Sequence, residues 1–294
     1  MATLSQWVEG ARPRTLPAAL SPVLVGTGAA YALDKGEAAF ALLALLVSLA
    51  LQLGVNYAND YSDGIRGTDQ DRVGPVRLVG QRLARPGDVK AVAMLCFASA
   101  ALIGLALVAL SGAFVMLPVG AASIVAAWYY TGGKSPYGYS GLGEVFVFVF
   151  FGLVATLGTT YTQALTLSTA TIAGAVGVGA LASAILVANN LRDIPTDRSH
   201  GKRTLAVRLG QARTRQLYAV LVIVALACVV LVGTIHPSAL IALLSFVLAI
   251  PLLRRVLGGA VGKDLVPVLT GTGRFELAYG LLLAIGLAAA THLG

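Results

Sequence analysis

The stretch Asn56-Tyr-Ala-Asn59-Asp60-Tyr-Ser-Asp63-Gly-Ile-Arg66-Gly-Thr-Asp69-Gln-Asp71-Arg72 decides the fold of this chain, because it places an acidic cluster at the end of a long apolar run. The run starts near Ala38, so the cluster marks the point where a lipid-soluble segment meets water. Asn56, Asp60 and Asp63 are spaced i, i+4 and i+7, which puts them on one stripe of a helix that continues through them. Carboxylates at the edge of a membrane helix are candidate functional residues.

A second cluster of the same kind follows a later apolar run and reads Asn189-Asn190-Leu-Arg192-Asp193-Ile-Pro-Thr-Asp197-Arg198. Asn189, Asp193 and Asp197 are spaced i, i+4 and i+8, so they also share a helical face. The two acidic stripes are predicted to stand at the same membrane depth and to form the two sides of one site.

Composition indicates an integral membrane protein with a single domain over residues 1–294. Of the 294 residues, 57% are hydrophobic and 12% are charged, whereas about 25% of a soluble chain is charged. The mean hydropathy is +0.83. A membrane-spanning helix needs about 20 mostly apolar residues. The sequence predicts an all-α bundle of nine transmembrane helices, over Thr15–Leu33, Ala38–Val55, Ala91–Leu110, Phe114–Tyr130, Leu142–Tyr161, Ala170–Asn189, Gln216–Ile235, Pro237–Leu253 and Phe275–Leu293.

The distribution of basic residues predicts the orientation of this bundle. If the N-terminus is cytoplasmic, every Lys and Arg except Lys35 falls on the cytoplasmic side, as the positive-inside rule requires. Both acidic clusters then face the cytoplasm, and the active site is expected there. The net charge of +8 follows from the cytoplasmic loops, so nucleic-acid binding is not needed to explain it.

The two clusters together suit a magnesium–diphosphate site. A concentration of carboxylates needs counter-ions, and Mg²⁺ is commonly bound by a few carboxylates together with substrate phosphates. The candidate metal ligands are Asn56, Asp60, Asp63, Asn189, Asp193 and Asp197. The candidate diphosphate-binding residues are Asn56, Asn59, Arg66, Arg72, Arg77, Lys134, Asn189, Asn190, Lys202 and Arg203. Because the helices offer apolar walls for a hydrocarbon tail, the expected ligand is an isoprenoid diphosphate in the lipid bilayer.

These motifs resemble the UbiA superfamily of intramembrane aromatic prenyltransferases, and within it the branch that acts on 1,4-dihydroxy-2-naphthoate in menaquinone biosynthesis. Besides the two acidic clusters, the resemblance is carried by Ala11 to Ala18, Asp71 to Arg77, Pro136 to Glu144 and Gly201 to Gly210. It covers nearly the whole chain. Asp69 lies six residues beyond Asp63, a spacing similar to that of the naphthoate branch.

The resemblance implies an ionising alkyl transfer. Mg²⁺ and basic residues would stabilise the departing diphosphate, and aromatic faces would stabilise the allylic cation. The dihydroxynaphthoate ring would then attack the cation and lose its carboxylate as CO₂. The expected catalytic residues are Asp60, Asp63, Asp69, Asp193, Asp197, Tyr130 and Tyr139. Asp63 or Asp69 is a hypothetical base for the acceptor hydroxyl.

Two kinds of alternative remain at this stage. The same chemistry on another aromatic acceptor, such as a hydroxybenzoate or homogentisate, would use the same motifs. A membrane transporter or lipid carrier would have a similar composition, but coupled carriers usually place charged groups in mid-membrane, and the predicted spans lack such groups. A CDP-alcohol phosphotransferase also uses membrane-edge aspartates, but its Asp-Gly-x-x-Ala-Arg pattern is absent from the sequence.

Overall fold

The computed structural model describes residues 2–67 and 76–293, with side chains described as far as residue 290, and every described element is helical. In chain order the elements are α1 (Leu4–Gly10), η1 (Pro13–Thr15), α2 (Pro17–Tyr31), α3 (Ala38–Ile65), α4 (Pro86–Ser111), α5 (Met116–Tyr129), η2 (Tyr137–Tyr139), α6 (Gly143–Val147), η3 (Phe148–Val154), α7 (Ala155–Ala164), α8 (Thr169–Ser199), α9 (Leu205–Ile235), η4 (Pro237–Leu248), α10 (Ala249–Leu257), η5 (Gly262–Leu265) and α11 (Val266–Leu293). Of the η elements, η3 is a π-helix and the others are 3-10 helices. The predicted all-α fold is confirmed for these residues.

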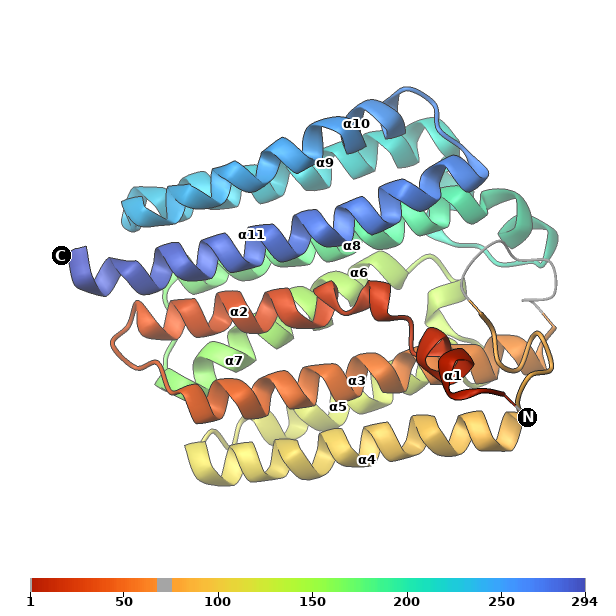
Figure 1. The fold of residues 1–294 in the computed structure, drawn as a ribbon, viewed down its shortest axis with the longest axis horizontal. Coiled ribbons are helices and arrows are strands. Elements are labelled where there is room, and N and C mark those ends of the chain that lie inside the picture. The colour runs from red at the N-terminus through yellow and green to blue at the C-terminus, as the bar shows by residue number, and fades with distance from the viewer. Residues whose placement is uncertain (1, 68–75, 294) are drawn as a thin grey trace.

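The helices lie side by side and run back and forth along one axis (Figure 1). Each of the nine predicted spans overlaps a described helical segment, where α6, η3 and α7 form one segment and η4 and α10 form another. Seven described segments are long and apolar enough to cross a membrane. The other two, α2 with 15 residues and α5 with 14, are shorter than the about 20 residues that a span requires.

Two helices extend beyond their predicted spans and carry the acidic clusters with them. α3 continues ten residues past Val55, and α8 continues to Ser199 with Pro195 inside it. Asn and Asp usually weaken a helix because their side chains compete for its backbone groups. In α3 the Asp60 carboxylate instead accepts hydrogen bonds from outside the helix. α3 and α8 both end at the end of the bundle where the N-terminus lies (Figure 1).

Small residues allow the helices to approach closely. A Cβ added to Gly152 in η3 would lie 2.4 Å from the Cα of Gly179 in α8, and one added to Gly28 in α2 would lie 2.6 Å from the Cα of Ala284 in α11. Any larger residue would separate these pairs. Close backbone approach at small residues is the usual means of helix packing in lipid.

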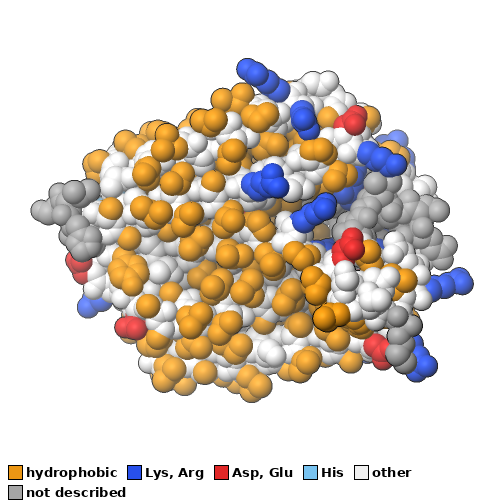
Figure 2. Space-filling model, in the orientation of Figure 1, with side chains coloured by type: hydrophobic (Ala, Val, Ile, Leu, Met, Phe, Trp, Pro, Cys, Tyr) orange, Lys and Arg blue, Asp and Glu red, His pale blue; other side chains and the backbone are white. Residues whose placement is uncertain are grey.

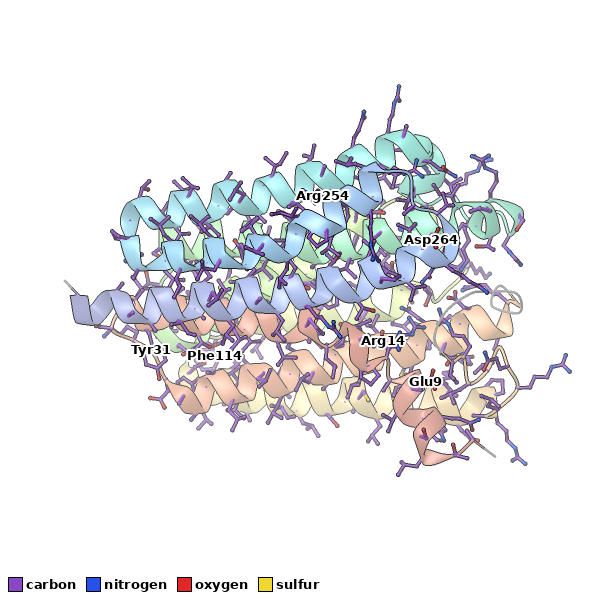
Figure 3. The ribbon with its side chains drawn as sticks, turned by 45° about the horizontal axis from the view of Figure 1, so that its top comes forward. Glu9, Arg14, Tyr31, Phe114, Arg254 and Asp264 are labelled. Atoms are coloured by element: carbon purple, nitrogen blue, oxygen red, sulfur yellow. The ribbon has the colours of Figure 1, made fainter. Side chains whose placement is uncertain are left out.

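The surface has an apolar band and a charged end. Many leucines in the band are exposed, including Leu95, Leu102 and Leu244, as expected of side chains that face lipid. In the view of Figure 2, Lys and Arg gather at the end where α3 and α8 finish, and few lie at the opposite end. Figure 3 shows Glu9 and Asp264 toward this charged end, and Tyr31 and Phe114 at the other. The charged end is therefore the end with the acidic clusters.

Candidate active site

A cavity of about 1570 Å³ opens among the helices and is lined by residues of both acidic clusters. It is larger than the roughly 300–1,000 Å³ of most small-molecule sites. Its charged residues stand at the charged end of the bundle, and its apolar walls extend to Leu107 near the end of α4 and Met116 at the start of α5. The cavity therefore joins a polar site to an apolar channel that runs along most of the bundle.

α3 turns Asn56, Asn59 and Asp63 toward this cavity but turns Asp60 away from it. Asn59 and Asp63 are about 40° apart around the helix, whereas Asp60 is about 100° from Asn59. The fully buried Asp60 accepts hydrogen bonds from the backbone amides of Leu78 at 2.7 Å and Val79 at 3.0 Å. The predicted stripe is therefore corrected at one position: Asn56 and Asp63 face the cavity together with Asn59, whereas Asp60 anchors the segment that contains Leu78 and Val79.

Asp63 connects the first acidic cluster to Lys202, which follows the second acidic cluster in the sequence. Its carboxylate accepts a hydrogen bond from the Tyr139 hydroxyl and lies 3.6 Å from the Lys202 ammonium group. That ammonium group also stands 4.3 Å from the centroid of the Tyr139 ring. Lys202 lies three residues after Ser199, the last residue of α8, and donates its backbone N–H to the carbonyl of Asp197. Residues about 140 positions apart in the sequence are thus joined at one point, as the two-sided site requires.

α8 contributes the opposite wall. Asn189, Asn190 and Asp197 line the cavity. Asp193 does not line the cavity. The guanidinium of Arg192, which does, donates to the two carboxylate oxygens of Asp193 at 2.7 and 2.8 Å. The Asn190 amide donates to the buried Glu144 carboxylate at 2.9 Å. Glu144 thereby fixes the orientation of Asn190.

The segment between α5 and α6 covers the polar end of the cavity. Thr131 donates its hydroxyl proton to the Asn59 side chain at 2.7 Å, and the Arg66 guanidinium donates to the carbonyls of Thr131 and Gly133. The Tyr137 hydroxyl donates to the carbonyl of Ala126 at 2.6 Å, and burial raises the pKa of Tyr137. These bonds hold Tyr139 over Asp63.

The structure brings together most, but not all, of the residues predicted from the sequence. The predicted residues that line the cavity are Asn56, Asn59, Asp63, Arg77, Tyr130, Tyr139, Asn189, Asn190, Asp197 and Lys202. Those that are described but stand outside its lining are Asp60, Arg66, Lys134, Asp193 and Arg203; among them, Arg66, Lys134 and Arg203 are exposed. Asp69 and Arg72 lie outside the described residues.

Sequence reasoning gave no site role to several other lining residues, which are Arg12, Arg14, Thr15, Gln52, Phe146, Phe150, Phe151 and Arg192. One signal was available for Gln52, because a lone amide inside the apolar run of α3 is unusual. The three phenylalanines gave no such signal, because an aromatic residue in an apolar helix is equally suited to face lipid.

The donor set suits a magnesium ion bound together with phosphate. Among the described residues, no three His, Cys, Asp or Glu side chains gather to hold a metal unaided. Asp63 and Asp197 nevertheless line one cavity, with the amides of Asn59, Asn189 and Asn190 beside them. Mg²⁺ commonly binds one or two carboxylates and takes its remaining ligands from phosphates and water. Lys202, Arg77 and Arg192 supply the positive charge that a diphosphate needs.

Comparison with known sequences gives one family and a set of full-length relatives. Residues 19–264 match the model of the UbiA prenyltransferase family. The chain is 55% identical to the 1,4-dihydroxy-2-naphthoate octaprenyltransferase of Mycobacterium tuberculosis, over 98% of each protein. It is 39% identical to the protein of the same name from Escherichia coli, over 96% of this chain and 94% of that one.

Solved structures show the same fold at low sequence identity. A UbiA homolog from Aeropyrum pernix superposes with a TM-score of 0.67 at 15% identity and covers 94% of this chain and 97% of its own. A UbiA homolog from Archaeoglobus fulgidus bound to DMAPP and Mg²⁺ superposes with a TM-score of 0.62 at 16% identity and covers 95% and 99% of the two chains. At this identity the likeness concerns the fold alone.

Proposed function

Because the chain belongs to the UbiA prenyltransferase family, we propose that it transfers the polyprenyl group of a polyprenyl diphosphate to 1,4-dihydroxy-2-naphthoate, with release of diphosphate and CO₂. The names of the full-length relatives support this acceptor and this donor. The product is demethylmenaquinol, the quinol precursor of menaquinone.

The observation that carries the proposal is the single cavity with two chemically different ends. Asp63, Asp197 and Lys202 stand at its polar end, and apolar helix walls enclose the rest. A diphosphate on a long hydrocarbon chain has the same two-part character. The apolar channel would also keep water from the allylic carbon, since hydrolysis would compete with transfer.

Different residues of this chain bind the diphosphate and stabilise the allylic cation. Lys202, Arg77 and Arg192 bind the diphosphate oxygens by charge-assisted hydrogen bonds and stabilise the charge that grows as the allylic C–O bond breaks. The electron pair of that bond leaves with the diphosphate. Tyr139 and Tyr130 offer ring faces to the allylic cation. The acceptor ring then forms the new C–C bond, and the pair from the broken ring–carboxylate bond returns to the ring.

Mg²⁺ is the proposed cofactor, held by Asp63 and Asp197 with help from Asn59, Asn189 and Asn190. When bound, it supplies Lewis-acid stabilisation of the leaving diphosphate. Asp60 and Asp193 support the site in this proposal: Asp60 anchors the segment that carries Arg77, and Asp193 orients Arg192.

We further propose that all nine predicted segments span the cytoplasmic membrane and that the site faces the cytoplasm. The gathering of Lys and Arg at the charged end favours this orientation. A cysteine introduced at exposed Lys134 should react with a membrane-impermeant thiol reagent in inverted vesicles and not in intact cells. The reverse pattern would overturn the orientation.

The enzymatic proposal is tested with purified protein, a polyprenyl diphosphate and a set of acceptors. Diphosphate release and a prenylated, decarboxylated product should require both Mg²⁺ and dihydroxynaphthoate. If the protein prenylates a hydroxybenzoate or homogentisate and not dihydroxynaphthoate, the proposed acceptor is wrong and the proposed prenyl transfer is right. Movement of lipid across a vesicle membrane without diphosphate release would show that the chain is a carrier.

A further inference from the structure

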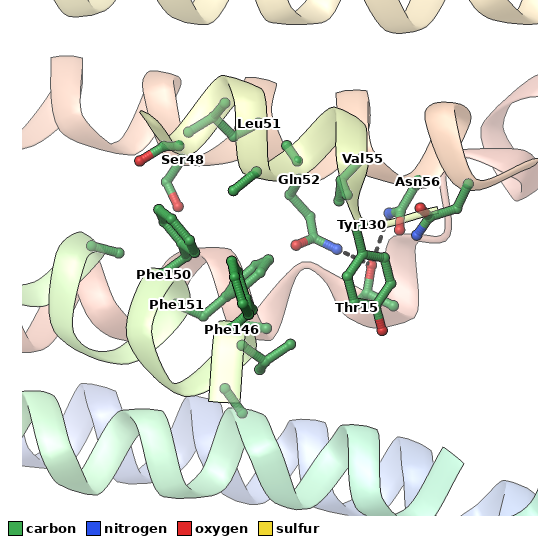
Figure 4. Close-up of a pocket in the computed structure, with 18 of the residues that line it drawn as sticks. Thr15, Ser48, Leu51, Gln52, Val55, Asn56, Tyr130, Phe146, Phe150 and Phe151 are labelled. Atoms are coloured by element: carbon green, nitrogen blue, oxygen red, sulfur yellow. Dashed lines mark hydrogen bonds between the residues drawn. The ribbon is translucent and has the colours of Figure 1, made fainter. Parts of the chain in front are cut away.

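A hydrogen-bond network of two side-chain amides and one hydroxyl lies in the cavity wall, on the side of the acidic clusters that leads to the apolar channel. Thr15 accepts hydrogen bonds from the side-chain amide of Gln52 at 2.7 Å and from that of Asn56 at 3.0 Å. All three residues line the cavity, and Figure 4 shows the two amides converging on the Thr15 hydroxyl. Gln52 and Asn56 are one helical turn apart on α3, so both stand on its cavity face.

The protons in this network fix the orientation of both amides. The Thr15 hydroxyl donates its own proton to the carbonyl of Arg12 at 2.9 Å, so its lone pairs accept from the two amide nitrogens. Asn56 donates a second time, to the carbonyl of Ala11 at 2.9 Å. Because a carbonyl oxygen cannot donate, each amide must turn its nitrogen toward Thr15. Both side-chain oxygens are therefore directed away from Thr15.

The oxygen of Gln52 is an acceptor that the described part of the chain leaves unused. It is buried and has no hydrogen-bond partner there, and the Gln52 side chain is only 5% exposed. An unsatisfied polar atom in an apolar segment is costly and calls for an explanation. In Figure 4 this oxygen points to the side of the phenylalanines Phe146, Phe150 and Phe151, which line the cavity across from α3. The site thus pairs a hydrogen-bond acceptor with an aromatic wall.

The chemistry of the substrates identifies which of them this acceptor can bind. A hydrocarbon tail has no proton to donate, and an ionised diphosphate carries only acceptor oxygens, which the Gln52 oxygen would repel. A hydroxyl group on an aromatic ring donates a proton, and its ring can stack against phenylalanine. Gln52 lies seven residues before Asn59, or about 10 Å along the helix, which places the ring beside the first part of the tail rather than among the phosphates.

We propose that Gln52, oriented by Thr15, accepts a hydrogen bond from a ring hydroxyl of the aromatic acceptor and makes the cavity selective for hydroxylated rings. This inference rests on the proposed prenyl transfer and adds the acceptor subsite. Asn56 contributes its oxygen to the same subsite one turn closer to the diphosphate.

The test compares binding with turnover in Gln52→Met, which keeps the length of the side chain and removes the amide. Calorimetry with 1,4-dihydroxy-2-naphthoate and no prenyl diphosphate should give a Kd about threefold to tenfold weaker than in the wild type. In the transfer assay, the KM for dihydroxynaphthoate should rise by the same factor, and the KM for the prenyl diphosphate should stay within about twofold. Thr15→Val should have the same effect, because it releases the orientation of the amide.

Ligand analogues and a matched variant make the result specific. Two analogues of dihydroxynaphthoate each lack one of its two hydroxyl groups. The analogue that lacks the hydroxyl donating to Gln52 should bind the wild type and Gln52→Met with equal affinity. Gln163→Met serves as the control, since Gln163 does not line the cavity; its amide donates to the carbonyl of Thr159 and accepts from the backbone N–H of Glu37.

Three results would overturn the inference: equal weakening of both substrates, equal weakening of every analogue, or no binding of dihydroxynaphthoate to the wild type. If wild type binds dihydroxynaphthoate through Gln52 but transfers nothing to it, the proposed function fails while the subsite stands.

Discussion

Replacement of Asp60 by Asn should destabilise the protein rather than its magnesium site. The fully buried Asp60 carboxylate accepts one backbone N–H from Leu78 and one from Val79, and a hydrogen bond to a charged group contributes about 1.5–3 kcal/mol. Asn can accept only one of these protons and turns an N–H₂ group toward the other. We therefore expect the free energy of unfolding to fall by about 3 kcal/mol, and by more in Asp60→Ala.

The assay is thermal unfolding in detergent together with a magnesium titration of prenyl transfer. Asp60→Asn should lower the apparent Tm and weaken prenyl diphosphate binding, because Arg77 adjoins the anchored segment, while half-maximal activation should need the same Mg²⁺ concentration as the wild type. Asp63→Asn should show the opposite pattern, and exposed Asp88, changed to Asn, should show neither effect. An unchanged Tm with a shifted magnesium requirement in Asp60→Asn would refute the anchoring role and restore Asp60 as a metal ligand.

Three other changes probe the rest of the cavity. Chelation of divalent ions should abolish transfer, and added Mg²⁺ should restore it; activity that survives chelation would contradict the proposed cofactor. Lys202→Met should reduce kcat/KM for the prenyl diphosphate at least tenfold with little change in Tm, since it removes one charge-assisted contact; an unchanged kcat/KM would remove Lys202 from the diphosphate site. Gly104→Phe should impair transfer of an octaprenyl group far more than transfer of a geranyl group, because the new ring would fill part of the apolar channel. Gly104 lines the cavity, and among the described residues a Cβ added there would meet only Val47, at 3.9 Å. Equal loss with both donors would show that the hydrocarbon tail binds elsewhere.

Much of the architecture could be predicted because lipid leaves the backbone few choices. Apolar runs of about 20 residues in lipid must be helical, so each predicted span overlaps a helix. The ends were less predictable. α3 and α8 continue ten residues beyond Val55 and Asn189, because tertiary hydrogen bonds to side chains such as Asp60 offset the poor helix propensity of Asn and Asp.

The identity of the polar residues was easier to predict than their direction. The spacing of Asn56, Asp60 and Asp63 fits one helical stripe, yet a stripe defined by sequence has no fixed rotation about the helix axis. The rotation of α3 is set by where Leu78 and Val79 present their amides, and that contact involves residues beyond the motif. Gln52 and Thr15 escaped notice for a similar reason, since their pairing depends on how the N-terminal segment folds back against α3.

The wide turn at η3 has a consequence for how this aromatic wall can change over time. A π-helix commonly marks one residue more than an α-helix would need at that place. Here it spans Phe148–Val154, which begins two residues after Phe146 and includes Gly152, the residue in close contact with Gly179. Loss of the codon for Val149 would let the segment revert to a regular helix, and Phe146 and Phe148 would rotate by about 100° relative to Gly152. One deletion, with no change in any side chain, could thus exchange the ring-facing surface for another and open a new acceptor range.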